Sequence, residues 1–561
     1  MNSALHYEVE AFDTSRPKLM GRHAAGESFL RGYARHAAAD TLLCYARTRK
    51  DFEDFERRVA ELGGRRRPCQ WIAQGDLAGL GRAGCLFHPA PSIADLAWQR
   101  RFSSPNAYSL CGITHTTASE NVMDAIGAMM VAPFQPWDAV ICTSRAARAT
   151  IEHIHSRWSA YLAERTGGKA ISPVQLPIIP LGVECDELAA SASSENIRAA
   201  LRKRYGIGEE DVVVLFMGRL SYHAKAHPLP LYLGLEEAAA RTQKRIHLIQ
   251  AGWFANESIE KSFAEGAKIF CPSVSTLFLD GRESPIRQSI WFAADIFASL
   301  SDNIQETFGL TPVEAMAAGL PVVASDWDGY RDTVRNNIDG IMIPTFMPPT
   351  GSGEELAYRH FAGIDNYDHY IGYVSQCAGV DLRATADAFT ALIGDAELRR
   401  RMGEAGRKRA REEFDWRVIV AAYQALWADL AERRSREQVI ALRAPGAPAH
   451  PLRDDPFSVF STYPSFVLDP DWLAVSMPGI GLANLDRVRS VRMNSYAEQI
   501  LAPAEEIRAL LSRVIAECPV PISALIGVNT EPHRRALLLR GLGWLGKMGL
   551  IRFEPPKPKS P

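Results

Sequence analysis

Two glutamates, Glu306 and Glu314, flank a stretch of polar, aromatic and small residues in the middle of the chain. Between them, Thr311 is typical of a helix N-cap, and Gly319 further on is typical of a helix end, so the pattern predicts a short helix. The free backbone N–H groups and the positive dipole end of such a helix favour a phosphate group. Thr311 and Glu314 also fit a capping box, which gives Glu314 an alternative, purely structural role.

Two cations follow an apolar run at Val212–Met217. Such a run is typical of a strand that is buried on both faces of a parallel sheet. Arg219 carries a planar fork that matches phosphate oxygens, and Lys225 adds a mobile point charge. The pair therefore predicts a diphosphate contact, while the alternative from the local sequence is two surface cations.

Two segments in the first part of the chain also favour ligand contact. His115 directly follows a predicted strand, although a lone histidine is more often structural. The segment Gly21–Glu27 predicts a glycine-flanked loop before a helix over Ser28–Ala39. Such a loop brings backbone N–H groups close to a phosphate or sugar, and its alternative is an ordinary tight turn.

Short apolar runs alternate with helical patterns along most of the chain. This alternation predicts βαβ units and parallel sheets, in which ligands bind at the carboxyl ends of the strands. We predict strands over 41–45, 84–88, 107–113, 139–143, 212–217, 247–250, 276–279, 295–299 and 321–325, and helices over 51–62, 120–131 and 144–165.

The composition is that of an ordinary globular protein, with 47% hydrophobic and 23% charged residues. The net charge of −2 gives no reason to expect nucleic acid as a partner. Nine cysteines without a C-x-x-C pair favour a reducing compartment and argue against a zinc site. Since neither a signal-peptide pattern nor a long apolar run occurs, we expect a cytoplasmic protein with at most peripheral membrane contact.

The glutamate stretch resembles the E-x7-E signature of retaining nucleotide-sugar glycosyltransferases of family 4 (glycosyltransferase group 1), together with the flanking F-G-L, E-A-M-A-A-G and P-V-V-A. The segment from Gly218 to Lys225 resembles the G-R-L…K motif of that family, except that Ala226 replaces the usual glycine. The resemblance covers roughly residues 15–430. It implies a GT-B fold, in which two doubly wound Rossmann-like domains face each other across a cleft.

The resemblance also implies roles for individual residues. Glu306, His115, Arg219 and Lys225 form the expected catalytic set, with Glu306 positioning the sugar instead of attacking it. No metal and no cofactor besides the donor are expected. The expected contacts are Arg219, Lys225, Leu310, Thr311, Gly21 and Arg22 with the donor diphosphate, His115, Glu306, Phe308 and Gly309 with the donor sugar, and Glu314, Gly281 and Arg282 with the nucleoside.

The implied activity is transfer of a sugar from a UDP- or GDP-linked donor to an acceptor hydroxyl, with retention of configuration. The acceptor is expected to be a glycan, a lipid-linked molecule or a small molecule of glycan or glycoconjugate biosynthesis. Two alternatives stay open. One is a GT-B epimerase or phosphorylase, and the other is a non-catalytic nucleotide-sugar-binding protein with a C-terminal interaction module.

The composition and the resemblance together predict several domains. A tyrosine- and glycine-rich insertion over 344–379 is either an acceptor-site lid or a surface for packing or oligomer contact. The predicted parts are an acceptor-side domain over 1–190, a nucleotide-sugar-binding domain over 191–412, a helix returning to the first domain over 413–440, a linker over 441–455, and a small, mainly helical accessory domain over 456–561, for which a winged helix is one interpretation.

Overall fold

The computed structural model describes residues 2–14, 21–64, 66–192, 195–527 and 529–556. Contacts between residues divide the chain into two units, Met1–Pro451 and Leu452–Pro561. The first unit contains two six-stranded sheets, and the second contains a three-stranded sheet with helices. Within the described ranges, no helix is long and apolar enough to cross a bilayer.

The first sheet is parallel throughout, with the strand order β3-β2-β1-β4-β5-β6. Its strands are β1 (Ala4–His6), β2 (Leu42–Ala46), β3 (Cys69–Ala73), β4 (Cys85–Phe87), β5 (Ser109–Ile113) and β6 (Ala139–Ile141). The helices around it are α1 (Val9–Phe12), α2 (Gly21–His36), α3 (Arg49–Gly63), α4 (Leu77–Ala83), α5 (Ala94–Arg100), α6 (Glu120–Ala128) and α7 (Arg145–Thr166). The sequence did not predict β1 or β3.

The predicted loop over Gly21–Glu27 is wrong, because this segment forms the first turns of α2. Most residues between the two glycines are good helix formers. Gly26 allows close packing instead, since a Cβ at this position would overlap the backbone of Ala11 in α1. The glycine therefore serves close contact between two helices and not the approach of a phosphate.

The second sheet is also parallel, with the order β12-β11-β10-β7-β8-β9. Its strands are β7 (Val212–Met217), β8 (Ile246–Gly252), β9 (Ser275–Asp280), β10 (Ile296–Ser299), β11 (Val322–Ser325) and β12 (Gly340–Ile343). Its helical segments are α8 (Cys185–Ala192), α9 (Glu195–Arg204), α10 (Leu229–Thr242), α11 (Glu257–Phe270), α12 (Ser284–Ser289), η1 (Ile290–Ala293), α13 (Leu310–Ala318), α14 (Tyr330–Thr333), α17 (Leu382–Gly394), α18 (Ala396–Arg409) and η2 (Ala410–Phe414).

Apolar clusters cover both faces of the second sheet. In β7, Val213 and Leu215 join one cluster, whereas Val212 and Val214 join another. Every residue of β7 is buried, which is why its sequence is continuously apolar instead of alternating. The predicted pair of doubly wound α/β domains is confirmed by the two parallel sheets with their helices, although the predicted domain boundaries themselves stay predictions.

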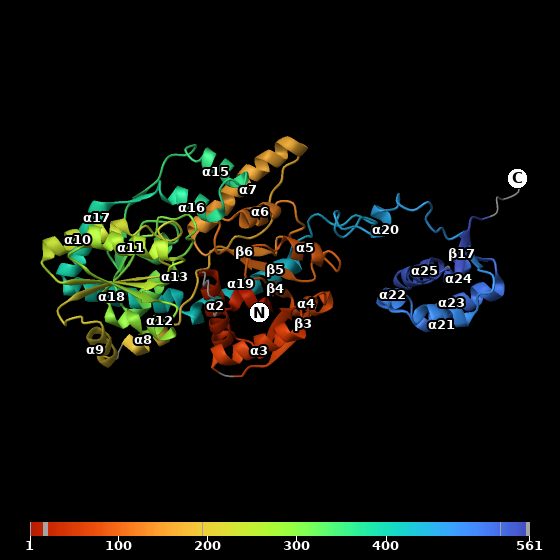
Figure 1. Cartoon of the computed structure of the whole chain (residues 1–561), viewed down its shortest axis with the longest axis horizontal. Helices are drawn as coiled ribbons and strands as arrows, with labels where there is room; N and C mark the ends of the chain where they lie inside the picture. Colours follow the sequence, from red (N-terminus) through yellow and green to blue (C-terminus); the bar gives the residue numbers. More distant parts are fainter. Residues whose placement is uncertain (1, 15–20, 65, 193–194, 528, 557–561) are drawn as a thin grey trace. The chain divides into compact units, whose positions relative to one another are not determined.

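The helix α19 (Trp416–Arg436) follows the second sheet in the chain but contacts α2 and β5 of the first. Figure 1 shows it in cyan among the red and orange elements of the first sheet. The indole Nε1 of Trp416 donates to Ser28 Oγ at 2.9 Å. Just before the helix, the chain pairs with the earlier connection between the sheets, since Val183 N donates to Phe414 O at 2.8 Å.

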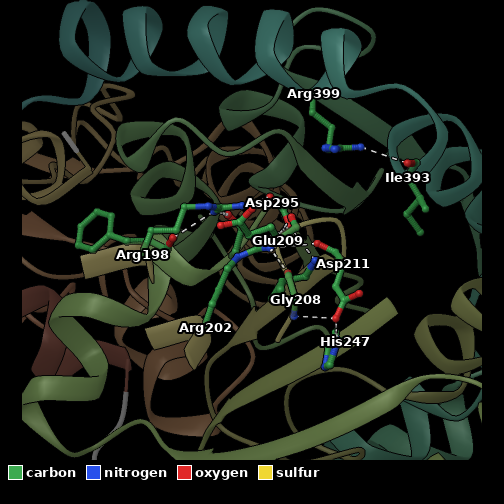
Figure 2. A network of polar contacts seen from close by, with 12 residues as sticks. Arg198, Arg202, Gly208, Glu209, Asp211, His247, Asp295, Ile393 and Arg399 are labelled. Atoms are coloured by element: carbon green, nitrogen blue, oxygen red, sulfur yellow. Dashed lines mark hydrogen bonds and ion pairs between the residues drawn. The ribbon is translucent and has the colours of Figure 1, made fainter. Parts of the chain in front are cut away.

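A polar network fixes the amino edge of the second sheet. Figure 2 shows Arg198 and Arg202 of α9 directed at the carboxylate of Asp295, which also accepts a bond from the backbone N–H of Val213 at 2.8 Å. In the same view, His247 Nε2 lies 2.8 Å from Asp211 Oδ2. These side chains lie at the edge of the sheet where β7 and β8 begin. They are therefore on the opposite edge from the carboxyl ends of the strands, where ligands bind in such sheets.

The insertion over 344–379 is ordered and contains β13 (Thr345–Phe346), α15 (Glu354–Phe361), α16 (Tyr367–Ser375) and β14 (Gly379–Val380). Ile371 of α16 is buried against Ala118 and Ala224. On α15, by contrast, Phe361 is 81% exposed. The inner face of α16 therefore has the predicted packing role, and the lid hypothesis stays a prediction.

The second unit forms an antiparallel sheet in the order β16-β15-β17. Its elements are α20 (Pro456–Val459), β15 (Leu473–Ser476), α21 (Leu482–Arg489), α22 (Arg492–Ser495), η3 (Glu498–Ile500), α23 (Ala504–Glu517), β16 (Val520–Pro521), α24 (Ile522–Ile526), α25 (Pro532–Lys547) and β17 (Ile551–Glu554). Leu511, Leu542 and Leu545 belong to a separate core. The mainly helical accessory domain is confirmed, and the winged-helix interpretation stays a prediction.

Candidate active site

Loops at the carboxyl ends of the two sheets contact each other. Thr307, in the loop after β10, donates its hydroxyl to the backbone carbonyl of His115, which follows β5. The hydroxyl groups of Thr116 and Tyr367 lie 3.4 Å apart. The loops that carry the predicted residues His115 and Glu306 therefore meet in one region between the two domains.

Lys225 and Glu306 form a salt bridge in this region, with side chains that are 19% and 15% exposed. Glu306 Oε1 also accepts bonds from the backbone N–H groups of Thr307 at 3.2 Å and Gly309 at 3.1 Å. Burial alone would raise the pKa of Glu306, but Lys225 and the backbone N–H groups of Phe308 and Thr307 outweigh it and lower the pKa. Burial alone would lower the pKa of Lys225, but the charge of Glu306 outweighs it and raises the pKa. Both side chains are therefore charged at neutral pH.

Arg219 lies beside the loop that carries Glu306. Its Nη2 donates to Ala224 O at 2.8 Å, and Gln305 donates to the same oxygen at 3.3 Å. Among the described side chains, no carboxylate forms a salt bridge with this guanidinium. Burial lowers the pKa of Arg219, and the charge of Asp368 acts against that change. A cation without a fixed carboxylate partner suits an anionic ligand.

The prediction that Thr311 caps α13 is wrong. The N-cap is Gly309, with φ of +88°, and no side chain accepts a capping bond at this helix, which also removes the capping-box role of Glu314. Only glycine suits position 309, because φ is positive and a Cβ would overlap the ring of Tyr330. Thr311 instead lies in the first turn, where its buried Oγ1 has no hydrogen-bond partner in the described structure.

The start of α13 therefore offers a hydroxyl as well as the positive end of the helix dipole. The neighbouring Phe308 has a different function from the one expected. Its side chain is 2% exposed and its ring centroid lies 6.3 Å from that of Phe414. Phe308 therefore packs in the core and can offer only its backbone to a sugar.

Glu314 lines a cavity of about 580 Å³. Burial raises the pKa of its carboxyl to about 7, and the charge of Arg287 acts in the opposite direction. The other lining residues come from both domains and are Thr14, Ala24, Glu27, Ser28, Arg31, Val183, Glu184, Glu187, Leu188, Arg287, Gln288, Trp291 and Leu310. A carboxyl group in a cavity is well placed to accept bonds from ribose hydroxyls.

Three other predicted residues, Gly281, Arg282 and Gly21, do not line the Glu314 cavity. Gly281 and Arg282 follow the edge strand β9, Arg282 forms an ion pair with Asp280 at 2.7 Å, and neither lines the Glu314 cavity. Gly21 is exposed, and a Cβ there would meet no atom within 4 Å. The side chain of Arg22 lies outside the described structure.

The sequence did not single out His6 and His88, which stand at the ends of β1 and β4. Their Nδ1 atoms are 2.8 Å apart, and His115 Nε2 lies 3.1 Å from Pro89 O. Burial, followed by the charges of His6 and His115, lowers the pKa of His88 to about 3. The available signal was a polar residue at the end of a predicted strand, since the strand predicted over 84–88 ends at His88.

Two further acids in the second domain, Asp302 and Asp328, were also missed. Burial raises the pKa of Asp302 to about 7. Asp302 accepts a bond from Ser375 Oγ at 3.1 Å, which fastens α16 to the loop after β10. In the described part of the chain, no group of three or more His, Cys, Asp or Glu side chains is arranged to hold a metal ion.

Comparison with known proteins gives a family match and several relatives. Residues 197–349 match the family described as glycosyl transferases group 1. The D-inositol 3-phosphate glycosyltransferase of Xylanimonas cellulosilytica is 25% identical over 262 residues, which are 46% of this chain and 52% of that protein. The phosphatidyl-myo-inositol mannosyltransferase of Mycobacterium leprae is 25% identical over 372 residues, which are 66% of this chain and 78% of that protein.

The match thus spans about half the length of the inositol phosphate enzyme. Among solved structures, Anabaena HepE in complex with UDP is similar with a TM-score of 0.50 and 16% identity. The similarity covers 76% of this chain and all of that chain, and at this identity it concerns the fold.

Two parallel sheets with the clustered side chains between their carboxyl ends define a GT-B protein. Residues 197–349 of this chain are thus similar to the glycosyl transferases group 1 family. The predicted resemblance to that family is confirmed by this match and by the relatives.

Proposed function

We propose that this protein transfers a sugar from a UDP- or GDP-linked donor to an acceptor hydroxyl, with retention of the anomeric configuration. The observation that carries the proposal is the cluster at the carboxyl edge of the second sheet. There the Lys225–Glu306 ion pair stands beside Arg219, which has no salt-bridge partner among the described carboxylates, and beside the start of α13. The family match over residues 197–349 covers all of these residues.

The proposed chemistry follows from charge. Breaking the bond between the anomeric carbon and the diphosphate leaves negative charge on the phosphate and oxocarbenium character on the sugar. Arg219, Lys225 and the N-terminus of α13 would stabilise the leaving diphosphate, with no metal in the proposed mechanism. One such contact that strengthens in the transition state is worth about 3 kcal/mol, or roughly a hundredfold in rate.

Glu306 is proposed to orient the sugar and to stabilise its positive character. Its carboxylate is fixed by Lys225 on one oxygen and by backbone N–H groups on the other, which suits positioning better than nucleophilic attack. His115 would reach the same sugar from the first domain. The contacts between the loops carrying these residues would exclude water, which otherwise hydrolyses the donor.

The relatives support the substrate classes in this proposal. The names of the Xylanimonas and Mycobacterium proteins describe transfer to an inositol phosphate or a phosphatidyl-myo-inositol, and HepE was solved with UDP. We propose by analogy a nucleotide diphosphate donor and a hydroxyl-bearing acceptor here. The proposed location is the cytoplasm, with the acceptor reached in solution or at a membrane surface.

The test uses the full chain without an acceptor. Binding of UDP, GDP, UDP-glucose and GDP-mannose is first measured by thermal stabilisation, because a ligand of the native state raises stability by mass action. The best donor is then followed by NMR as it is slowly hydrolysed. We expect the first sugar anomer released to have the configuration of the donor. Release of the inverted anomer would contradict retention, and a stable donor with no ligand-induced stabilisation would contradict the function.

A further inference from the structure

Asp328 has an unusual backbone conformation in the turn between β11 and α14. Its φ is +44°, in the left-handed region that side chains with a Cβ rarely adopt. The following residue, Gly329, is a glycine with an ordinary negative φ. Left-handed backbone at a residue other than glycine is unfavourable and is found disproportionately at ligand sites, so the Asp328 side chain calls for an explanation.

The turn lies along the loop that carries Glu306. The indole of Trp327 donates to Asn303 O at 3.1 Å, near the start of that loop. A Cβ on Gly329 would overlap the backbone at Thr307 and Phe308. These contacts, on either side of Asp328 in the sequence, hold the carboxyl group beside the proposed donor-sugar site.

The carboxyl group of Asp328 has an unused acceptor. Its Oδ1 is buried and has no hydrogen-bond partner in the described structure. Burial raises the pKa of Asp328 well above its ordinary value, and the negative charges of Glu306 and Asp332 raise it further. The backbone N–H of Gly329 and the charge of Arg331 act in the opposite direction. A buried acceptor without a partner is costly to the free protein, so it gains most from a ligand that donates a hydrogen bond.

The surrounding charges define the kind of donor that fits. Lys225 is already paired with Glu306, and Arg331 is paired with Asp326 at 2.9 Å, so no nearby cation is held by Asp328. Among the described residues, no group of three or more His, Cys, Asp or Glu side chains is arranged to hold a metal ion here. A neutral hydroxyl group fits best, because it can donate a hydrogen bond to Asp328 without bringing another charge into this buried place.

We propose that Asp328 accepts a hydrogen bond from a hydroxyl group of the transferred sugar and so helps to select the donor. The proposal rests on the proposed function, since it needs a nucleotide sugar beside Glu306. In this proposal, the turn after β11 contacts the sugar of the donor and not its nucleotide. The unfavourable backbone would then be retained because it places the carboxyl group.

The test compares Asp328→Gly with the wild type and with Asp326→Asn. Glycine suits the left-handed backbone, so Asp328→Gly should fold and melt at the same or a higher temperature. Asp326 is the matched control, because it lies in the same turn but is paired with Arg331 at the surface. Calorimetric titration of each full-length protein measures Kd for UDP-glucose and GDP-mannose, and for UDP and GDP as ligands without sugar.

We expect Asp328→Gly to weaken binding of the nucleotide sugar about tenfold, while Kd for the matching nucleoside diphosphate changes less than about twofold. Asp326→Asn should change neither. An unchanged Kd for the nucleotide sugar, or an equal loss for both ligands, would overturn the assignment of Asp328. A wild-type protein that binds none of the four ligands would refute the function itself, which keeps the two failures separate.

Discussion

The carboxyl edges of the two sheets differ in charge. At the first, the paired rings of His6 and His88 are buried together, and burial holds the pKa of both below the ordinary value. At the second, burial is overcome by pairing, so Lys225 and Glu306 stay ionised. The first edge, called the neutral edge below, thus has a histidine pair that is neutral at neutral pH, whereas the second, the charged edge, has a fixed ion pair.

This difference suggests that the two edges bind different parts of the reaction's substrates. A diphosphate needs fixed cations and a helix N-terminus, which the second edge supplies. A hydroxyl-bearing acceptor needs neutral donors and acceptors, which imidazole rings supply without the cost of burying a charge. Mutations that act on one edge and not on the other can break or sharpen the comparison.

The largest effect is expected from Lys225→Met. This change removes one proposed phosphate contact and leaves Glu306 as a buried carboxylate without its partner, so we expect donor turnover to fall about a thousandfold. The measurement is kcat/KM for donor hydrolysis. Lys261→Met is the matched control, because that lysine is 73% exposed. Near-normal turnover in Lys225→Met would mean that the charged edge does not bind the diphosphate.

A pH effect of about five- to tenfold is expected at Glu314. Its raised pKa of about 7 makes the carboxyl mostly neutral at pH 6 and ionised at pH 8, so the affinity for UDP or GDP should rise between these values. Glu314→Gln should lack this rise, as measured by titration at both pH values. The titration of the nucleotide itself affects both proteins equally, and identical profiles would remove Glu314 from the ribose site.

The same shift predicts a stability effect with a definite sign. The folded protein holds the Glu314 proton more tightly than the unfolded chain does, so stability is lost as the pH rises from the ordinary value of 4.5 to about 7, and it levels off above that. Without nucleotide, Glu314→Gln should therefore be more stable than the wild type at pH 8, by about 1 kcal/mol or more, and should match it more closely at pH 6. Thermal melting at the two pH values measures this difference.

A smaller effect on the donor is expected from His88→Gln. Since this histidine belongs to the neutral edge, Kd for UDP or GDP should change less than about threefold. The lowered pKa of about 3 means that the folded protein resists protonation of His88, so stability is lost as the pH falls below about 6.5. The variant should lose less stability than the wild type between pH 7 and pH 4. If His88→Gln bound the nucleotide as weakly as Lys225→Met does, the two edges would not differ in their contribution to nucleotide binding.

The smallest effect is expected from Arg145→Ala. Arg145 donates to Asp332 across the two domains, but its side chain is 73% exposed, and such surface pairs contribute about 0–1 kcal/mol. We expect kcat/KM for donor hydrolysis to fall at most about fivefold, with the loss shrinking at high salt. A loss comparable to that of Lys225→Met would show that domain closure, and not the charged edge, limits turnover.

The sequence predicted the parts of the fold whose residues carry their own signal. The run at β7 is continuously apolar because both faces of the strand are covered, and that cause is visible in the residues. β1 lies inside the first sheet but has only three residues, too few for any periodicity. The start of α2 was misread because Gly26 serves contact with α1, which depends on tertiary structure.

The site followed the same division. Lys225, Glu306 and His115 were predicted from their charge, their position after a strand and the family resemblance, and their roles stay predictions. The cap of α13 was misplaced because Thr311 fits a cap pattern, while the requirement for glycine at 309 comes from the ring of Tyr330. Asp328 could not be found at all, since neither its positive φ nor its unpaired oxygen has a local signature.

The helix α19 has a consequence for the order in which the protein is made. The strands of the first sheet are complete at Ile141, yet the aromatic rings that cover Phe29 and Phe87 come from Trp416–Arg436. During synthesis an apolar face of the nascent first domain therefore stays exposed until residues 142–415 have been added and α19 follows. The second domain has to fold next to that unfinished neighbour, and α19 is the last piece that closes it.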